Sequence, residues 1–118
     1  MPAPPIDQLP LSVPAFQILL SLVGQDLHGY AIIKDIATRT DGAERLGAGT
    51  LYAILKRLLE DELIAEVQGG DAASDDQRRR YYRLTPLGRK VARAEVERLE
   101  RASAMARSTR LFGRTRQV

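Results

Sequence analysis

The sequence predicts a mainly α-helical domain that carries a small β-hairpin and continues into one long C-terminal helix. Three segments have apolar residues at the helical spacings of three and four, and two short segments around a glycine-rich stretch have the pattern of strands. A last helical pattern then runs without a break from Thr85 to about Arg107. A length of 118 residues is that of a single domain.

Composition excludes several classes of protein. The chain has no cysteine, so disulfides, thiol nucleophiles and thiolate metal sites are ruled out. No apolar run approaches the ~20 residues that span a bilayer. The segment before the first helix carries Asp7 and no basic residue, unlike a secretory signal. We therefore expect a cytoplasmic protein without a cofactor.

Charge is distributed unevenly along the chain. Residues 1–77 carry 5 basic and 12 acidic side chains, a net charge of −7. Residues 78–118 carry 13 basic and 3 acidic side chains, a net charge of +10, which brings the whole chain to +3. Such an asymmetry indicates a polyanionic partner or a membrane surface.

The first two helices follow from their caps and their apolar spacing. Ser12 can cap the first helix, Pro14 stands in its first turn, and Gly24 ends it. The spacing predicts one buried face made of Phe16, Leu19, Leu20 and Val23. A second helix follows the segment 28–30 and extends to about Arg39. Its buried residues are expected to be Ile32, Ile33, Ile36 and Ala37.

A third helix and a hairpin complete the predicted domain. Thr50 or Gly49 can cap the helix. Its buried face is expected to contain Leu51, Ile54, Leu55, Leu58 and Leu59. Strands are expected over residues 63–67 and 80–84, on either side of the polar segment 69–76. In the second strand we expect Tyr82 to face the core and Tyr81 to face outward.

The long helix opens at Thr85-Pro86, a capping residue followed by proline at the first helical position. A narrow seam of heptad-like spacing runs along it, formed by Ala92, Val96, Leu99, Ser103 and Ala106. A helix of roughly 20 residues that outruns a small core must bury such a seam, and a second copy of the chain is the expected partner. We assign the seam, together with Phe16, to a homodimer interface.

This order of elements is typical of a winged helix-turn-helix domain, in which the third helix lies in the major groove of DNA and the hairpin tip touches the adjacent backbone or minor groove. Small residues at the start of that helix allow close approach to phosphates, hydroxyl groups add hydrogen bonds, and three arginines stand at the wing. The expected DNA contacts are Tyr30, Lys34, Gly49, Thr50, Leu51, Tyr52, Lys56, Arg78, Arg79 and Arg80.

The chain accordingly divides into four parts. We expect residues 1–11 to form a flexible arm and residues 12–85 to form the winged helix-turn-helix domain. Residues 86–108 are the expected dimerisation helix. Residues 109–118 are expected to form a basic, disordered tail.

Three blocks of this sequence resemble the signature of the PadR family of bacterial transcriptional regulators. They are Leu-His-Gly-Tyr at residues 27–30, the segment 49–58, and Arg-Tyr-Tyr-Arg-Leu-Thr-Pro-Leu-Gly-Arg at residues 80–89. The resemblance extends over about residues 12–100 and is closest to the compact subfamily with a single dimerising C-terminal helix. It implies a dimer that represses a nearby promoter through a pseudo-palindromic operator, and repression that small aromatic or lipophilic compounds relieve.

An effector held between the C-terminal and first helices would change the spacing of the two recognition helices, and Phe16, Val96 and Leu99 are candidates to line its pocket. The chain departs from the family pattern at Glu62, where glycine is usual before the Leu-Ile pair that opens the wing. If this position needs a positive φ angle, Glu62 costs up to ~1 kcal/mol.

Two other functions are open at this point. A winged-helix module that binds proteins and not DNA would show no salt-dependent DNA affinity and would bury the seam against a partner other than itself. A small hydrolase would need a Ser-His-Asp arrangement, but the only histidine, His28, stands before a helix, where a capping role is typical. A metal site would have to use carboxylates without cysteine or a second histidine, so none is expected.

Overall fold

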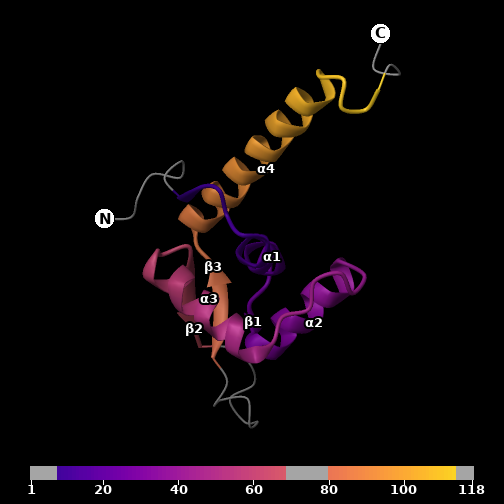
Figure 1. The fold of residues 1–118 in the computed structure, drawn as a ribbon. Helices are drawn as coiled ribbons and strands as arrows, with labels where there is room; N and C mark the ends of the chain where they lie inside the picture. Colours follow the sequence, from indigo (N-terminus) through magenta and orange to yellow (C-terminus); the bar gives the residue numbers. More distant parts are fainter. Residues whose placement is uncertain (1–7, 69–79, 114–118) are drawn as a thin grey trace.

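A computed structural model describes residues 8–68 and 80–113. In it the mainly helical fold with a small sheet and one long C-terminal helix is confirmed (Figure 1). The elements are α1 (Val13–Ser21), β1 (Leu27–His28), α2 (Gly29–Arg39), α3 (Ala48–Glu60), β2 (Ile64–Val67), β3 (Tyr81–Leu84) and α4 (Pro86–Arg107). Among the described residues, no helix combines the length and the hydropathy that crossing a membrane requires.

Helix α1 has two apolar faces, and of the predicted buried residues only Leu19 is confirmed. The residues buried in the core are Ala15, Ile18, Leu19 and Leu22. Phe16 and Leu20 are only half-buried, and Val23 is exposed. The spacing of three and four fits both faces, because apolar residues stand on nearly every side of this short helix. Its N-terminus is as predicted, since Ser12 Oγ accepts a hydrogen bond of 3.2 Å from the Ala15 N–H.

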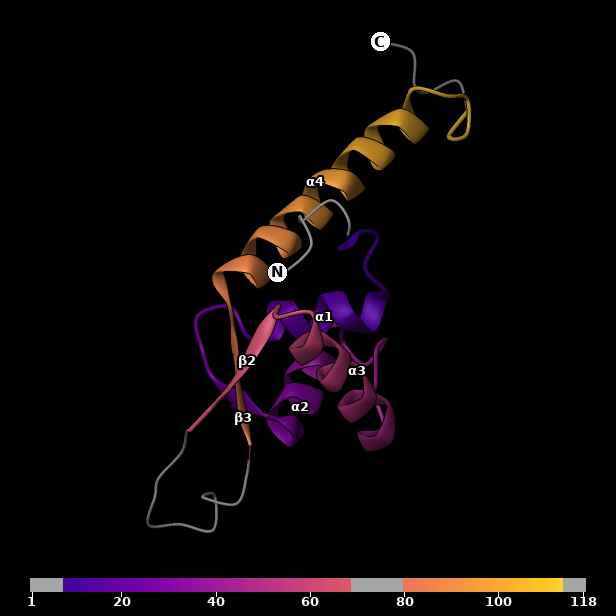
Figure 2. The ribbon, with the colours of Figure 1, turned by 90° about the vertical axis from the view of Figure 1, so that its left-hand side faces the viewer.

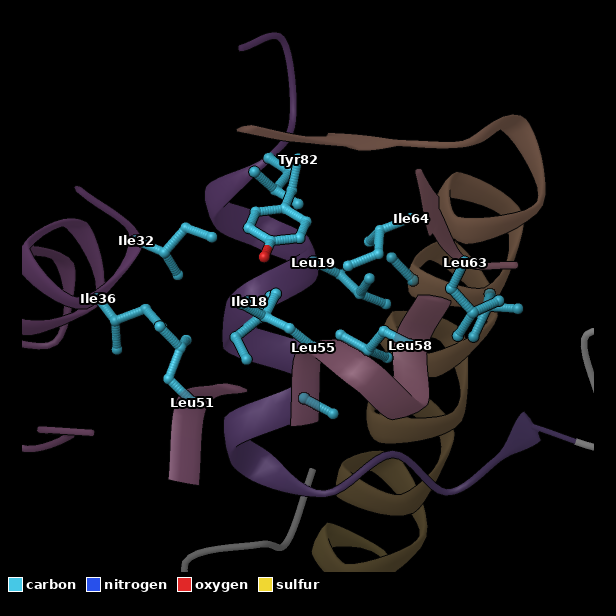
Figure 3. Packing of buried hydrophobic residues seen from close by; sticks show 14 residues of the cluster. Ile18, Leu19, Ile32, Ile36, Leu51, Leu55, Leu58, Leu63, Ile64 and Tyr82 are labelled. Atoms are coloured by element: carbon cyan, nitrogen blue, oxygen red, sulfur yellow. The ribbon is translucent and has the colours of Figure 1, made fainter. Parts of the chain in front are cut away.

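The sheet has a third strand that the sequence pattern does not reveal. Its order is β1-β3-β2 with both pairs antiparallel, and Leu27 of β1 lies opposite Tyr82. Tyr82 is buried beside α1 (Figure 3). Tyr81 turns outward, and its ring is edge-on to the His28 ring with 5.3 Å between the ring centres. His28 also caps α2, because its Nδ1 accepts a hydrogen bond from the Ala31 N–H.

The core lies between the three short helices, the sheet and the first turns of α4. Leu51, Leu55 and Leu58 of α3 and two isoleucines of α2 are buried in it, as their spacing predicts (Figure 3). Hydrogen bonds of Arg39 join α2 to α1, since its guanidinium donates to Gln17 and to Ser21 Oγ. The same guanidinium also donates to Asp35 of its own helix.

Thr85 connects the end of α3, the sheet and the start of α4. Its hydroxyl donates to the Glu62 carbonyl at 2.7 Å and accepts from the Gly88 N–H at 2.9 Å, and its own N–H donates to the Leu63 carbonyl. Gly88 is required at this point, because a Cβ there would overlap the Leu63 carbonyl group. The turn between α3 and β2 holds Glu62 at φ 63°, the left-handed conformation in which a side chain is strained.

Helix α4 packs on its own domain only near its start. Val91, Ala92 and Glu95 are buried, and the helix then projects beyond the core (Figure 2). Glu95 is 2% exposed and receives two hydrogen bonds, of 2.7 and 2.8 Å, from the Arg98 guanidinium. That pairing holds the pKa of the Glu95 carboxyl below its usual value, although burial alone would raise it. A hydrogen bond between the Leu11 backbone and the same carboxyl group also lowers the pKa.

The two chain ends contain more ordered structure than the predicted arm and tail imply. Leu9 and Leu11 pack against the core, so the end of the predicted arm is part of the domain. Residues 109–113 form a turn after α4, which the Gly113 N–H closes by donating to the Arg110 carbonyl. Residues 1–7 and 114–118 lie outside the described residues.

Replacing Glu62 by glycine is expected to stabilise the fold. The substitution removes the strain of a side chain at positive φ, so the free energy of unfolding should rise by about 1 kcal/mol and the melting temperature by about 4 °C. Glu62→Ala is the matched control, because it removes the same charge but retains the Cβ. Thermal unfolding at one protein concentration would contradict the strain argument if the alanine variant gained as much as the glycine variant.

The buried carboxylate of Glu95 predicts a loss of stability in acid. Because its folded-state pKa is lowered, its contribution is complete above the ordinary value of 4.5 and is lost as the pH falls through the lowered value. Urea unfolding at a series of pH values should show this loss in the native chain and in Glu97→Gln, a variant of an exposed carboxylate on the same helix. The loss should be smaller in Glu95→Gln, and an unchanged acid dependence in that variant would assign the loss to other groups.

Candidate nucleic-acid interface

The exposed face of α3 brings together most of the residues that were predicted to read DNA. Gly49, Thr50, Tyr52 and Lys56 are all exposed along the first two turns of this helix. Leu51 is the exception: its side chain is 0% exposed and packs in the core, so it offers no side-chain contact. Its place in the predicted set came from its position in the motif, whereas its helical phase puts it on the buried face.

The start of α3 is open and has no side-chain cap. The helix begins at Ala48 with Gly47 as its N-cap, whereas the sequence predicted Gly49 or Thr50 as the cap, two or three residues later. Within residues 8–68 and 80–113, no side-chain capping hydrogen bond is made at this helix start. A Cβ built on Gly47 or on Gly49 would meet nothing within 4 Å, so the backbone faces open space. An N-terminus of this form attracts anions, because its free N–H groups point outward and the helix dipole adds positive potential.

Tyr52 links the two helices of the helix-turn-helix. Its hydroxyl end lies so close to Gly29, the first residue of α2, that a Cβ there would overlap the phenol ring, with 2.8 Å to Cζ. The side chain is nevertheless 49% exposed. The absence of a side chain at Gly29 therefore makes room for the hydroxyl end of Tyr52 at the start of α2, while about half of the side chain stays exposed.

Helix α2 and the wing supply further cationic groups. Tyr30 and Lys34 lie on the exposed side of α2, with the Lys34 ammonium 5.6 Å from the centre of the Tyr30 ring. At the start of β3, Arg80 is exposed and forms an ion pair of 3.3 Å with Glu66 across the sheet. Arg78 and Arg79, the other predicted wing contacts, lie outside the described residues.

Two arginines not among the predicted contacts alter the electrostatic interpretation. Arg83 is one of the basic residues of the C-terminal half, but it is engaged by Asp26 in hydrogen bonds of 3.0 and 2.8 Å, a pairing that lowers the pKa of the aspartate. Arg57 follows Lys56 on α3 and pairs at 3.5 Å with Asp61. The excess of positive charge after residue 78 is therefore partly neutralised within the fold, which the count of charges along the sequence does not show.

The predicted dimer seam is exposed at its three middle residues. Ala92 is buried in the core of its own domain, which corrects its assignment to an interface. Val96 and Leu99 are 39% and 42% exposed, Ser103 is exposed, and Ala106 is half-buried. With Phe16 half-buried on α1, two apolar surfaces face away from the core near the base of α4.

The predicted effector residues and the grooves of this chain lie in different places. A groove of about 530 Å³ separates residues 8–12 from α3, and Ile54, Arg57 and Leu58 form part of its lining. Phe16, Val96 and Leu99 do not line this groove. A pocket lined by those three residues would need further residues to complete its lining.

The elements predicted to contact DNA and the free part of α4 lie at opposite ends of the molecule. The open end of the β2–β3 hairpin points away from α4 in both views (Figures 1 and 2). The molecule is accordingly long, with extents of 61 × 35 × 24 Å. The free part of α4 is therefore remote from the exposed face of α3.

Comparison with known proteins identifies the family of this architecture. Residues 18–94 match the transcriptional regulator PadR-like family. A transcriptional regulator from Clostridium thermocellum is similar in structure, with a TM-score of 0.66 and 31% identity over 81% of this chain and 90% of that one. A PadR family transcription regulator from Clostridium difficile R20291 gives a TM-score of 0.69 and 28% identity, over 80% of this chain and 94% of that one.

Two sequence relatives match the chain less completely. The uncharacterized protein X of Lysinibacillus sphaericus is 40% identical over 72 residues, which are 61% of this chain and 64% of that protein. An uncharacterized 37.1 kDa protein in transposon TN4556 of Streptomyces fradiae is 34% identical over 86 residues, 73% of this chain but 23% of the relative. The family match includes the whole helix-turn-helix, the sheet and the base of α4, and the chain therefore belongs to the PadR-like family of DNA-binding transcriptional regulators.

Proposed function

We propose that this PadR-like regulator is a homodimeric repressor that reads a pseudo-palindromic operator with α3 in the major groove. The observation that carries the proposal is the exposed face of α3, where an open helix start and two hydroxyl groups stand beside a lysine. The major groove of B-DNA admits one helix, and residues near its N-terminal end reach the base edges.

Each residue of this face has a distinct expected role. The backbone at Gly49 approaches a phosphate, because no side chain stands in the way. Thr50 and Tyr52 donate hydrogen bonds from their hydroxyl groups to bases or phosphates. Lys56, one turn later, contributes a positive charge to the phosphate backbone.

The wing and α2 hold the domain on the duplex. Arg80 and the neighbouring Arg78 and Arg79 are assigned to the backbone or the minor groove, where guanidinium groups bind well. Tyr30 and Lys34 are assigned to the backbone beside α2. Contacts of this kind give register and affinity, whereas α3 gives the choice of sequence.

Dimerisation would set the distance between two such domains. Half-sites on one face of DNA are about 34–36 Å apart, so the relative position of the two α3 helices decides affinity. The exposed apolar residues Val96 and Leu99 of α4 support a second copy as the partner. A small aromatic or lipophilic effector bound at Phe16, Val96 and Leu99, between two copies, would change this distance and release the operator.

DNA binding by α3 can be tested by fluorescence anisotropy with the upstream region of the gene as the probe and a scrambled duplex beside it. We expect sequence-dependent affinity that falls with salt. Lys56→Ala should reduce the slope of log K against log salt by about 0.9, the value for one lost phosphate contact. Arg101→Ala, an exposed arginine of α4, should leave the slope unchanged. Absence of salt-dependent affinity for either duplex would favour a module that binds proteins instead, and equal salt-dependent affinity for both would contradict sequence reading by α3 at this site.

Gly49→Ala separates stability from DNA binding. Alanine is the better helix former, and its Cβ enters open space, so the free energy of unfolding should rise by about 0.5 kcal/mol. The same Cβ would stand between the helix start and a phosphate, so operator affinity should fall about tenfold. Thermal unfolding and anisotropy on the same sample measure both quantities. A stabilised variant with native affinity would exclude close backbone approach at Gly49.

A further inference from the structure

We infer that a groove at the base of α4 binds a small molecule that carries phosphate or carboxylate groups. This basic groove lies between the loop after α1, the end of β3 and the first turn of α4, and its charged residues are Asp26, Arg83 and Arg89. It is separate from the exposed face of α3 and from the proposed effector pocket, so the inference goes beyond the proposed function.

The basic groove is a recess of the size that small ligands occupy. Its volume is about 450 Å³, and ligand pockets commonly have volumes of about 300–1,000 Å³. In Figure 2 the loop after α1 lies beside the point where β3 passes into α4. The buried Leu22 and the half-buried Leu84 contribute apolar surface, whereas the other side chains of the lining are polar or charged. Such a lining favours a charged ligand over a lipophilic one.

Arg83 retains hydrogen-bond donors beyond those that it uses within the fold. Its Nε and Nη2 atoms donate to the two carboxylate oxygens of Asp26 at 3.0 and 2.8 Å. A guanidinium group has five N–H donors, so the Nη1 edge remains for another acceptor. The side chain is also 60% exposed. Arg83 can therefore bind an oxyanion through this edge without leaving Asp26.

Arg89 brings a second guanidinium group to the basic groove, and this one has no counter-ion. The side chain is exposed, and over residues 8–68 and 80–113 no hydrogen bond or ion pair engages it. Arg93 follows one turn later on the same side of α4 and is equally unpaired within those residues. Asp26 is the carboxylate of the lining, and it already pairs with Arg83. The groove therefore combines one neutralised arginine with cations whose charge no described acidic residue balances.

The position of these cations is unfavourable for α4 itself. The start of a helix has partial positive charge, so acidic residues are favourable in its first turn and basic residues are not. The first turn of α4 contains no acidic residue and ends with Arg89, which Lys90 follows. Residues that break a local preference without a visible compensation are typical of functional positions. An anion bound in the groove would offset the repulsion, since it would face both guanidinium groups.

The two guanidinium groups define the class of ligand. Arginine binds phosphate and carboxylate oxygens through planar, charge-assisted hydrogen bonds. Two arginines at one recess favour a molecule with at least two anionic groups, a chemistry that phosphorylated compounds and polycarboxylic acids share. The groove lies at the opposite end of β3 from Arg80, the described wing residue that is assigned to DNA. A small anion can therefore occupy it while the wing is on a duplex.

Isothermal titration calorimetry of the full chain tests the site with inorganic pyrophosphate in one arm and citrate in the other. Sodium chloride keeps the ionic strength constant. We expect saturable binding, and Arg89→Gln should raise the dissociation constant about tenfold, the effect of losing one charge-assisted hydrogen bond. Arg101→Gln removes the same charge from an exposed position further along α4 and should leave the constant unchanged. Binding of pyrophosphate alone would identify the ligand as a phosphate compound, and binding of citrate alone would identify a polycarboxylic acid.

Asp26→Asn tests the same geometry from the opposite direction. The substitution removes the negative charge of the lining and releases donors of Arg83, so the dissociation constant of the anion should fall by about threefold. Glu60→Gln is the matched control, because it removes an exposed carboxylate at the end of α3, outside the lining. Circular dichroism checks that each variant is folded. Weaker binding in a folded Asp26→Asn variant would contradict the inference.

Four other results would overturn the site. The first is the absence of saturable binding of both anions at millimolar concentration. The second is an equal loss in Arg89→Gln and Arg101→Gln, which would mean a general attraction by net charge. The third is weaker anion binding in Lys56→Ala but not in Arg89→Gln, which would place the anion at α3. The fourth is a smaller salt dependence of operator binding in Arg89→Gln, which would assign this arginine to DNA. The proposed reading of DNA by α3 stands in each case, because it is measured separately.

Discussion

The hydrogen bonds of Thr85 are the constraint on which the arrangement of this molecule depends. One hydroxyl joins the turn after α3 to the first turn of α4, and the adjacent N–H extends the pairing toward β2. Gly88 lets the helix pass directly over the Leu63 carbonyl, so α4 leaves the sheet at a fixed angle. The turn after α3, the start of β2 and the first turn of α4 are thereby joined at one residue, because the strained turn at Glu62 is hydrogen-bonded to the same threonine.

The sequence predicted the helices well where a local signal marks their first residue or their buried face. Ser12, Thr85 and the helical phase of α3 located three elements correctly because caps and apolar spacing act over a few residues. Strand β1 was missed, since two residues have no periodicity and their pairing partner lies more than fifty positions later. The buried face of α1 was misassigned because a helix that is apolar on two sides has no preferred phase until its neighbours are known.

The candidate interface was predictable to a similar extent. Composition and motif located the hydroxyl and lysine residues of α3, but only packing shows that Leu51 is buried and that Ala92 belongs to its own core. The pairing of Arg83 with Asp26, far apart in the chain, neutralises one of the positive charges that the count along the sequence includes in the basic C-terminal part. Long-range contacts of this kind depend on the fold as a whole, so they have no signal in a short window of sequence.

The projection of α4 gives the molecule a mechanical property as well as a surface. A helix of 22 residues is about 33 Å long, and only its first turns are embedded in the domain. It works as a lever whose pivot is the contact among Glu95, Arg98 and the chain before α1. The part of the helix from Glu95 to Arg107 is about 18 Å long, so a tilt of a few degrees at this pivot moves the far end by about 1–2 Å. In the proposed dimer, side chains around the pivot would therefore set how far apart the two domains stand, although none of them is among the residues proposed to touch DNA.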